Sequence, residues 1–250
     1  MNFTDILCPA CALFLDFDGT LVEIASQPEA VVVPDGLVPM LEALQQYLGG
    51  AVAVISGRPM SQIDSFLAPL QLPLAGVHGA ERRDSDGKVT LLPAHPLQQV
   101  EDAAHALAQQ HPALLVENKR GSIALHYRQA PELEALCLET MHSAVDQSPG
   151  LTLLHGKMVV EAKPGGASKG RAIEAFLLEP PFAGRLPVFV GDDFTDEVGF
   201  STVQRLGGLG IKVGEGQSVA WKRLDTPAAL RGEMQKAVAA KAAKAAKAAS

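Results

Sequence analysis

Two aspartates stand two residues apart at the end of an apolar run: residues 12–15 read Ala-Leu-Phe-Leu, and Asp16, Phe17, Asp18 and Gly19 follow. Residues i and i+2 of a strand share a face, and open α/β sheets bind ligands at strand ends. We therefore expect both carboxylates in one crevice. Two anions there favour a hard divalent cation such as Mg²⁺, which takes oxygen ligands together with a substrate phosphate. The alternative is an ordinary Asp-Gly turn.

A second polar turn follows another apolar run, at residues 51–55. It contains Ser56, Gly57, Arg58 and Pro59. A small hydroxyl, a glycine that admits an anion to the backbone and a proline suited to the first helical position predict a phosphate-holding turn. A plain strand-to-helix turn is the alternative reading. Ser56 and Gly57 are the candidate phosphate contacts.

Lys169 opens an apolar-periodic stretch that predicts a helix. A cation in the first turn of a helix is opposed by the helix dipole. That position is reasonable if Lys169 faces a phosphate. An exposed surface lysine is the alternative.

A cluster of acids follows the apolar residues 187–190. Asp192, Asp193, Asp196 and Glu197 place four acids within six residues, and they would repel one another without cations or solvent. We expect Asp192 to bind a metal ion directly. Asp193 and Asp196 are expected behind it, where they would hold Lys169 or a metal-bound water.

Composition narrows the classes of function. The chain has 250 residues, 47% hydrophobic and 20% charged, with a net charge of −7, which argues against a nucleic-acid partner. No apolar run is long enough for a membrane span, and the N-terminus lacks a basic leader, so we expect a cytoplasmic protein without a membrane partner. Cys8, Cys11 and Cys137 are interpreted as reduced, inert thiols.

The string Asp16-Phe17-Asp18-Gly19-Thr20 resembles the first motif of the haloacid-dehalogenase-like phosphatases. The resemblance implies an α/β fold with a Rossmann-like parallel-sheet core. It also implies that Asp16 is the nucleophile that forms an aspartyl-phosphate, and that Asp18 is the general acid/base. Transport ATPases of this superfamily carry Thr at the second position, so Asp18 favours hydrolysis. Mg²⁺ would be held by Asp16, the Asp18 carbonyl and Asp192, while Ser56 and Lys169 bind the phosphoryl group.

Residues 83–162 differ from the rest, with two helical patterns and strand-like stretches that predict a smaller α+β cap inserted into a core of residues 1–82 and 163–250. Blocks in and before this cap resemble those of trehalose-6-phosphate phosphatases; they begin at Gly76, Glu117, Ala124 and Gly156. The resemblance implies that the disaccharide is gripped by five residues, Glu117, Lys119, Arg128, Lys157 and Glu161. For each residue alone, a solvated sheet face is the alternative.

The expected function is hydrolysis of trehalose 6-phosphate to trehalose and phosphate by a monomeric, Mg²⁺-dependent enzyme. Three alternatives stay open: another sugar-phosphate phosphatase, a non-catalytic phosphosugar sensor, and a phosphotransferase or mutase. The choice between Mg²⁺ and Mn²⁺ is also open, because both accept oxygen ligands. Residues 236–250 are an Ala/Lys tail, for which we expect a frayed, exposed helix.

Overall fold

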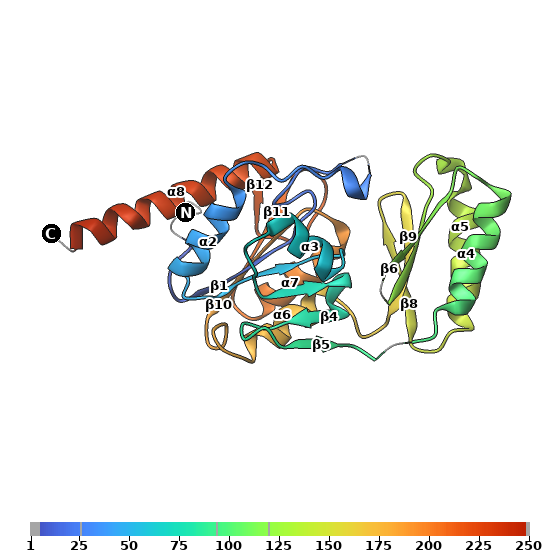
Figure 1. Ribbon diagram of the computed structural model, residues 1–250, viewed down its shortest axis with the longest axis horizontal. Coiled ribbons are helices and arrows are strands. Elements are labelled where there is room, and N and C mark those ends of the chain that lie inside the picture. Colours follow the sequence, from blue (N-terminus) through green and yellow to red (C-terminus); the bar gives the residue numbers. More distant parts are fainter. Residues whose placement is uncertain (1–5, 26, 94, 120, 249–250) are drawn as a thin grey trace. The chain divides into compact units, whose positions relative to one another are not determined.

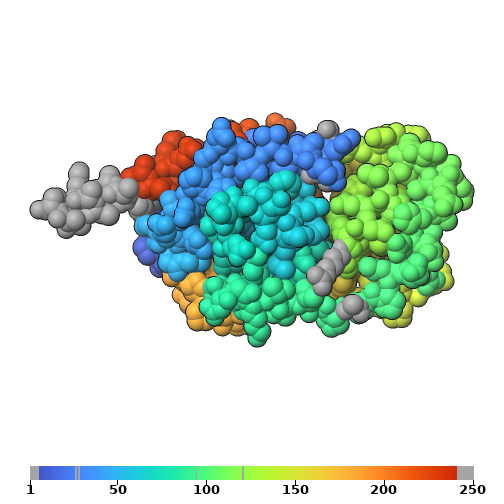
Figure 2. Space-filling model, in the orientation of Figure 1, coloured from blue at the N-terminus to red at the C-terminus, as the bar shows by residue number. Residues whose placement is uncertain are grey.

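The structure is a computed structural model that describes residues 6–25, 27–93, 95–119 and 121–248 (Figure 1). The described chain divides into two compact units. The core unit contains residues up to Val89 and from Lys169 onward, and the inserted unit contains Thr90–Ser168. In Figure 2 the inserted unit has green to yellow colours, while the core unit is blue to teal and orange to red.

The core unit is built on an eight-stranded sheet. Its strands, in spatial order, are β12 (Lys222–Leu224), β11 (Leu209–Val213), β10 (Leu186–Gly191), β1 (Cys11–Leu15), β2 (Val52–Ile55), β3 (Leu74–Gly76), β4 (Glu81–Arg83) and β5 (Val89–Leu91). The first six are parallel, and β4 is antiparallel to β3. The chain builds outward from β1 through β2 and β3, and after the insertion it returns on the other side of β1.

Helices cover both faces of this sheet, as Figure 1 shows. One face packs against α2 (Leu37–Tyr47), α3 (Met60–Leu67) and α8 (Pro227–Ala248). The other packs against α6 (Lys169–Leu177) and α7 (Glu197–Arg205). Among the described residues, this unit also contains the short 3-10 helices η1 (Pro28–Ala30), η2 (Val77–Gly79) and η4 (Phe194–Asp196). The expected Rossmann-like α/β class is confirmed.

Strand β1 is buried on both faces because it lies in the middle of the sheet. Leu13 and Leu15 contribute to the core beneath α2 and α8, whereas Ala12 and Phe14 contribute to the core beneath α6. Strands covered on both sides are continuously apolar. This explains why the run ends abruptly at Asp16, the first residue beyond the strand.

The inserted unit is an antiparallel sheet with helices on one face. Its strands, in spatial order, are β6 (Leu115–Lys119), β7 (Ser122–His126), β9 (Val159–Pro164) and β8 (Leu151–Gly156). Helices α4 (Gln98–Gln110) and α5 (Glu134–Asp146), the latter preceded by η3 (Pro131–Leu133), share a hydrophobic core with one sheet face. A single core of this kind is a compact α+β module.

The division between the units differs from the expected cap of residues 83–162. The structure places β4 and β5 in the core sheet. The inserted unit begins at Thr90, within β5, and ends at Ser168. Arg83 explains part of the difference, because its guanidinium forms two 2.7 Å hydrogen bonds to Asp64 of α3. The domain assignment of the insertion as a specificity cap stays a prediction.

Helix α8 starts earlier than the Ala/Lys tail suggested. It begins at Pro227, and Leu230, Met234 and Ala237 are buried on the core sheet. A helix therefore extends from the packed core into the tail sequence. Within the described residues, none of the helices combines the length and apolar character that crossing a bilayer requires.

Candidate active site

The site lies where the order of strands reverses. Strands β1 and β10 are parallel neighbours, with Leu15 opposite Val190, and the chain runs from them directly into Asp16 and Asp192. The backbone N–H of Asp16 donates to the Val190 carbonyl at 2.9 Å. In open α/β sheets ligands bind at such a switch point. The topology thus brings together two aspartates that are far apart in sequence.

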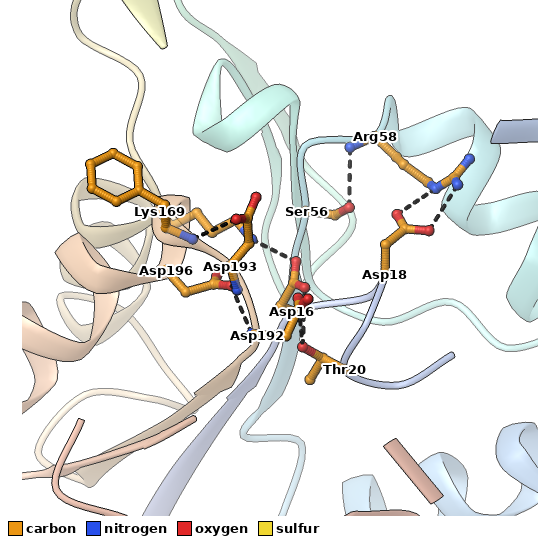
Figure 3. Close-up of polar contacts among 10 residues, drawn as sticks. Asp16, Asp18, Thr20, Ser56, Arg58, Lys169, Asp192, Asp193 and Asp196 are labelled. Atoms are coloured by element: carbon orange, nitrogen blue, oxygen red, sulfur yellow. Dashed lines mark hydrogen bonds and ion pairs between the residues drawn. The ribbon is translucent and has the colours of Figure 1, made fainter. Parts of the chain in front are cut away.

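Lys169 bridges two of the site's carboxylates. Its Nζ donates to Asp16 Oδ1 at 2.6 Å and to Asp196 Oδ1 at 2.7 Å, and only 4% of the residue is exposed (Figure 3). Burial opposes the charge on Lys169, but the two carboxylates outweigh burial and raise its pKa. The lysine at the start of α6 is therefore a fixed buried cation.

Burial raises the pKa of Asp16 well above its usual range; Lys169 counteracts this effect, and Asp196 and Asp192 add to it. Burial, reinforced by the charge of Asp196, raises the pKa of Asp192 to about 7. The Thr20 hydroxyl lies 3.2 Å from Asp16 Oδ2 and 3.4 Å from Asp192 Oδ1. The carboxylates carry more negative charge than Lys169 balances.

Asp196 shapes the loop that follows β10. Its Oδ2 accepts the backbone N–H groups of Asp192 at 3.0 Å and Asp193 at 2.9 Å, while its Oδ1 accepts from Lys169. Asp193 caps η4, and its Oδ1 accepts the N–H of Phe194 at 2.6 Å. Both oxygens of Asp196 are thus used in fixing Lys169 and the loop.

Gly19 allows the loop after β1 to approach the loop after β10. Its φ is +74°, and a Cβ built there would lie 2.1 Å from Asp192 Oδ2. Only a residue without a side chain fits this place. The carbonyl oxygen of Asp192 accepts a hydrogen bond from the Lys212 side chain, which fixes the other side of the same aspartate.

Asp18 faces Arg58. Arg58 Nε donates to Asp18 Oδ2 at 2.6 Å, and Nη2 donates to Oδ1 at 2.8 Å, a bidentate pair that Figure 3 shows apart from Asp16. The Arg58 guanidinium also lies 5.3 Å from the centre of the Phe66 ring and donates to Gln62 at 3.2 Å. Asp18 therefore has a fixed position in this structure.

The turn after β2 holds Ser56, Gly57 and Arg58. The Ser56 hydroxyl accepts the N–H of Arg58 at 3.1 Å, and the Ser56 carbonyl accepts the N–H of His78 at 2.9 Å. The His78 imidazole lies where a side chain on Gly57 would go, 2.7 Å from the built Cβ. His78 itself has a φ of +56°, an uncommon value for a non-glycine residue.

Three carboxylates beyond the strand ends lie close enough together to hold a hard divalent cation. Asp16, Asp192 and Asp196 each offer an oxygen, and these oxygens all lie within 4.8 Å of one another. Three carboxylates against one buried lysine leave excess negative charge, and hard cations prefer such oxygens. The residues present fit Mg²⁺.

The expected disaccharide residues lie in the inserted unit. Lys119 Nζ contacts Glu161 Oε2 at 2.9 Å and Glu117 Oε2 at 3.8 Å. The structure brings these three side chains together. Arg128 and Lys157 are exposed and lie outside this network of contacts. Both lie near the same end of β7, where the N–H of Tyr127 donates to the Met158 carbonyl at 3.0 Å.

Sequence reasoning missed several residues of these sites. It assigned no role to Thr20, Lys212 or the side chain of Arg58, and it left out His126, whose Nε2 lies 2.9 Å from Glu117 Oε2. Arg58 and Thr20 stand beside the recognised motifs, so their positions were a usable signal. His126 stands inside the block that begins at Ala124, so its position was a usable signal as well. Lys212 carries no such signal, because it reaches Asp192 from the neighbouring strand β11.

The fold places the chain in a known class. A solved haloacid-dehalogenase-like hydrolase from B. subtilis superimposes with a TM-score of 0.64 over 90% of this chain and 99% of that chain, at 16% identity. The C-terminal domain of the C. albicans trehalose-6-phosphate phosphatase superimposes with a TM-score of 0.83 over 92% of both chains, at 22% identity. These likenesses show that the chain has a haloacid-dehalogenase-like fold, with aspartates at the ends of two of its neighbouring strands.

Sequence comparison defines the family. Residues 14–230 match the family described as trehalose-phosphatase. The trehalose-6-phosphate phosphatase of Escherichia coli (strain K12) is 46% identical over 219 residues, which span 86% of this chain and 82% of the relative. The chain belongs to the trehalose-phosphatase family, as the motifs indicated.

Proposed function

We propose that the protein hydrolyses trehalose 6-phosphate to trehalose and inorganic phosphate, as a phosphoric monoester hydrolase. The observation that carries the proposal is the buried triad in which Lys169 donates to Asp16 at 2.6 Å and to Asp196 at 2.7 Å, beside Asp192. Membership of the trehalose-phosphatase family and the similarity to the E. coli enzyme support the substrate.

Asp16 is the proposed nucleophile. One of its carboxylate oxygens attacks phosphorus and forms an acyl-phosphate bond, while the bond from phosphorus to the sugar oxygen breaks. Lys169 holds the Asp16 carboxylate in place and contributes positive charge near the phosphoryl oxygens. Ser56, whose hydroxyl oxygen accepts the N–H of Arg58, keeps its own O–H to donate to a phosphoryl oxygen, next to the backbone of Gly57.

Asp18 is the proposed general acid/base. It donates a proton to the departing sugar oxygen, and it then takes a proton from the water that attacks the phosphorus of the acyl-phosphate, which regenerates Asp16. Both Asp18 oxygens accept hydrogen bonds from Arg58 in this structure. Asp18 must therefore release at least one of these bonds when it acts as an acid.

Mg²⁺ is the proposed cofactor, and when bound it would supply positive charge that neutralises the phosphoryl oxygens. Asp16, the backbone carbonyl of Asp18 and Asp192 would hold it. Asp196 is assigned to the loop and to Lys169, because both of its oxygens already accept hydrogen bonds. Asp193 is assigned to the same supporting role through its cap on η4.

The inserted unit is proposed to bind the disaccharide. Glu117, Lys119 and Glu161 form one polar cluster of acceptors and a donor, which suits a ligand with many hydroxyls. Arg128 and Lys157 are exposed cations on the same unit. We assign them to the substrate through the family resemblance of their motifs.

The test is release of inorganic phosphate from trehalose 6-phosphate, glucose 6-phosphate and sucrose 6-phosphate, with Mg²⁺ and with chelator. We expect strong, metal-dependent release from trehalose 6-phosphate alone, and none from Asp16→Asn. Equal release from all three sugars would keep the chemistry and contradict the substrate. Release from none would favour a phosphosugar sensor.

A cytoplasmic location is proposed as well, supported by the free thiols of Cys8, Cys11 and Cys137, which are typical of a reducing compartment. Fractionation of cells that produce the protein tests this location. The expected monomeric state stays a prediction, and sedimentation of the purified protein measures it.

A further inference from the structure

Four polar side chains of the inserted unit form a continuous chain of contacts. His126 Nε2 lies 2.9 Å from Glu117 Oε2, Lys119 Nζ lies 3.8 Å from the same oxygen, and Lys119 Nζ lies 2.9 Å from Glu161 Oε2. Three strands contribute, namely β6, β7 and β9. His126 is the member at the end of this chain.

The sheet register explains why these side chains meet. Glu117 pairs with Ala124 of β7, and Ala124 pairs with Glu161 of β9. His126 lies two residues beyond Ala124, so both side chains point to the same face. Glu117 and His126 are thus diagonal neighbours on adjacent strands, a separation that long side chains can bridge. The small Ala124 leaves room between Glu117 and Glu161.

His126 and Glu117 are only partly exposed, with 26% and 24% of their side chains accessible. Burial alone would raise the pKa of Glu117, but the hydrogen bond from His126 and the charge of Lys119 outweigh it and lower that pKa. Glu117 is therefore held as an ionised acceptor. Both its contact with His126 and its contact with Lys119 are made by Oε2.

We propose that His126 is a positioning residue, which fixes Glu117 through Oε2 so that Oε1 accepts a hydroxyl of the sugar. This inference rests on the proposed function, because it assumes that Glu117 contacts the sugar part of the substrate. His126 acts through Glu117 and does not itself touch the substrate. It thereby contributes to the selectivity for a sugar phosphate over a phosphate ester without a sugar.

The test compares His126→Leu, which removes the ring nitrogen, with His126→Gln, whose amide N–H can reach the same Glu117 oxygen. For trehalose 6-phosphate we expect His126→Leu to raise KM about tenfold, the effect of losing one hydrogen bond to a charged group, with kcat little changed. His126→Gln should recover most of the loss. Hydrolysis of p-nitrophenyl phosphate, which has no sugar, should be unchanged in both.

His155→Leu is the matched control. His155 lies on β8 of the same sheet, but it pairs with the buried Val160 and its ring lies 5.6 Å from that of His142 on α5, which places it on the opposite face. The His155→Leu substitution should leave KM for trehalose 6-phosphate unchanged.

In a Glu117→Gln background, His126→Leu should raise KM no further, because the two residues act as one unit.

Three results would overturn the inference. They are an unchanged KM in His126→Leu, an equally weakened hydrolysis of p-nitrophenyl phosphate, and a full further rise in KM when His126→Leu is added to Glu117→Gln. Failure of the unmodified protein to hydrolyse trehalose 6-phosphate would instead overturn the proposed function itself. The two failures are thus distinguished by the wild-type rate. Thermal unfolding of each variant separates lost positioning from lost folding.

Discussion

At the residue scale, the site depends on carboxylates held in an unfavourable environment. Asp192 faces Asp196, Lys169, Asp193 and Asp16, and burial is the main reason that its pKa rises to about 7. Its neighbours cannot neutralise it, because Lys169 is shared between Asp16 and Asp196. Such perturbed carboxylates are typical of functional sites.

A pH dependence follows from Asp192. Its pKa is about 7 in the folded protein against an ordinary value of 3.8, so between these pH values the folded state binds more protons than the unfolded state. The free energy of unfolding of the metal-free protein should therefore fall as the pH rises through this window. Thermal unfolding with chelator at pH 5 and pH 8 measures it.

The control for this experiment is Asp192→Asn, which cannot titrate and should show a smaller fall in melting temperature between the two pH values. Added Mg²⁺ should stabilise the wild type more at pH 8 than at pH 5, because protons compete with the metal for the carboxylates. Equal slopes for wild type and Asp192→Asn would contradict the assignment.

Gly19 provides a second prediction at this scale. Gly19→Ala and Gly36→Ala both introduce a side chain at positive φ, +74° and +81°, but only at Gly19 would the new Cβ collide with Asp192. The positive φ should lower the free energy of unfolding of each variant by about 1–2 kcal/mol, and the collision with Asp192 should add to this loss in Gly19→Ala. Gly19→Ala should also reduce phosphate release about a hundredfold or more, since misplacement by 1 Å has such effects. Comparable phosphate release from the two variants would show that the Asp192 contact is unimportant.

At the scale of elements, β1 is the strand that aligns the site, and aromatic packing holds it. The Phe14 ring lies 5.5 Å from that of Phe182 and 6.1 Å from that of Phe176 of α6. Through these contacts β1 and α6 are positioned relative to each other. Asp16 directly follows β1, and Lys169 is the first residue of α6. The contact between these two side chains therefore depends on that alignment.

Phe14→Ala should lower the free energy of unfolding by about 3–5 kcal/mol, because it leaves a cavity between β1 and α6. Leu178→Ala is the control at an apolar residue that is 85% exposed, and it should change stability by less than about 0.5 kcal/mol. Urea denaturation measures both. Similar midpoints for the two variants would contradict the packing argument.

At the scale of the whole molecule, the core unit is assembled from both ends of the chain around one insertion. Its last element, α8, packs against the core sheet through Leu230 and Met234 and donates from Arg231 to the Leu21 carbonyl at 2.8 Å. The early turns of α8 therefore close the core beside the loop that follows Asp16.

Two truncations test this arrangement. Removal of residues 241–250 should leave melting temperature and phosphate release unchanged, because the last buried residue that the structure describes is Ala237. Removal of residues 227–250 should lower the free energy of unfolding by about 3–6 kcal/mol, because it exposes the core residues that Leu230 and Met234 cover. A large loss in the shorter truncation would show that the Ala/Lys tail stabilises the fold.

The amino-acid sequence predicted the core well, since apolar runs that end in polar motifs depend on local periodicity alone. Asp16, Ser56 and Asp192 each stand where such a run ends, and Lys169 begins α6 as expected. The sequence predicted a hairpin turn at residues 84–88, but not that the flanking β4 and β5 strands belong to the core sheet, nor that α8 starts as early as it does. Their assignment depends on partners elsewhere, such as Asp64 for Arg83.

By itself, then, the sequence determined the α/β class, the family and the residues that stand at the strand ends, because these follow from short-range patterns. The tertiary structure decided which further side chains meet, such as Arg58 with Asp18 and His126 with Glu117. The physical reason is that such pairs form across neighbouring strands and loops. Their geometry depends on sheet order and register, which no single stretch of sequence contains.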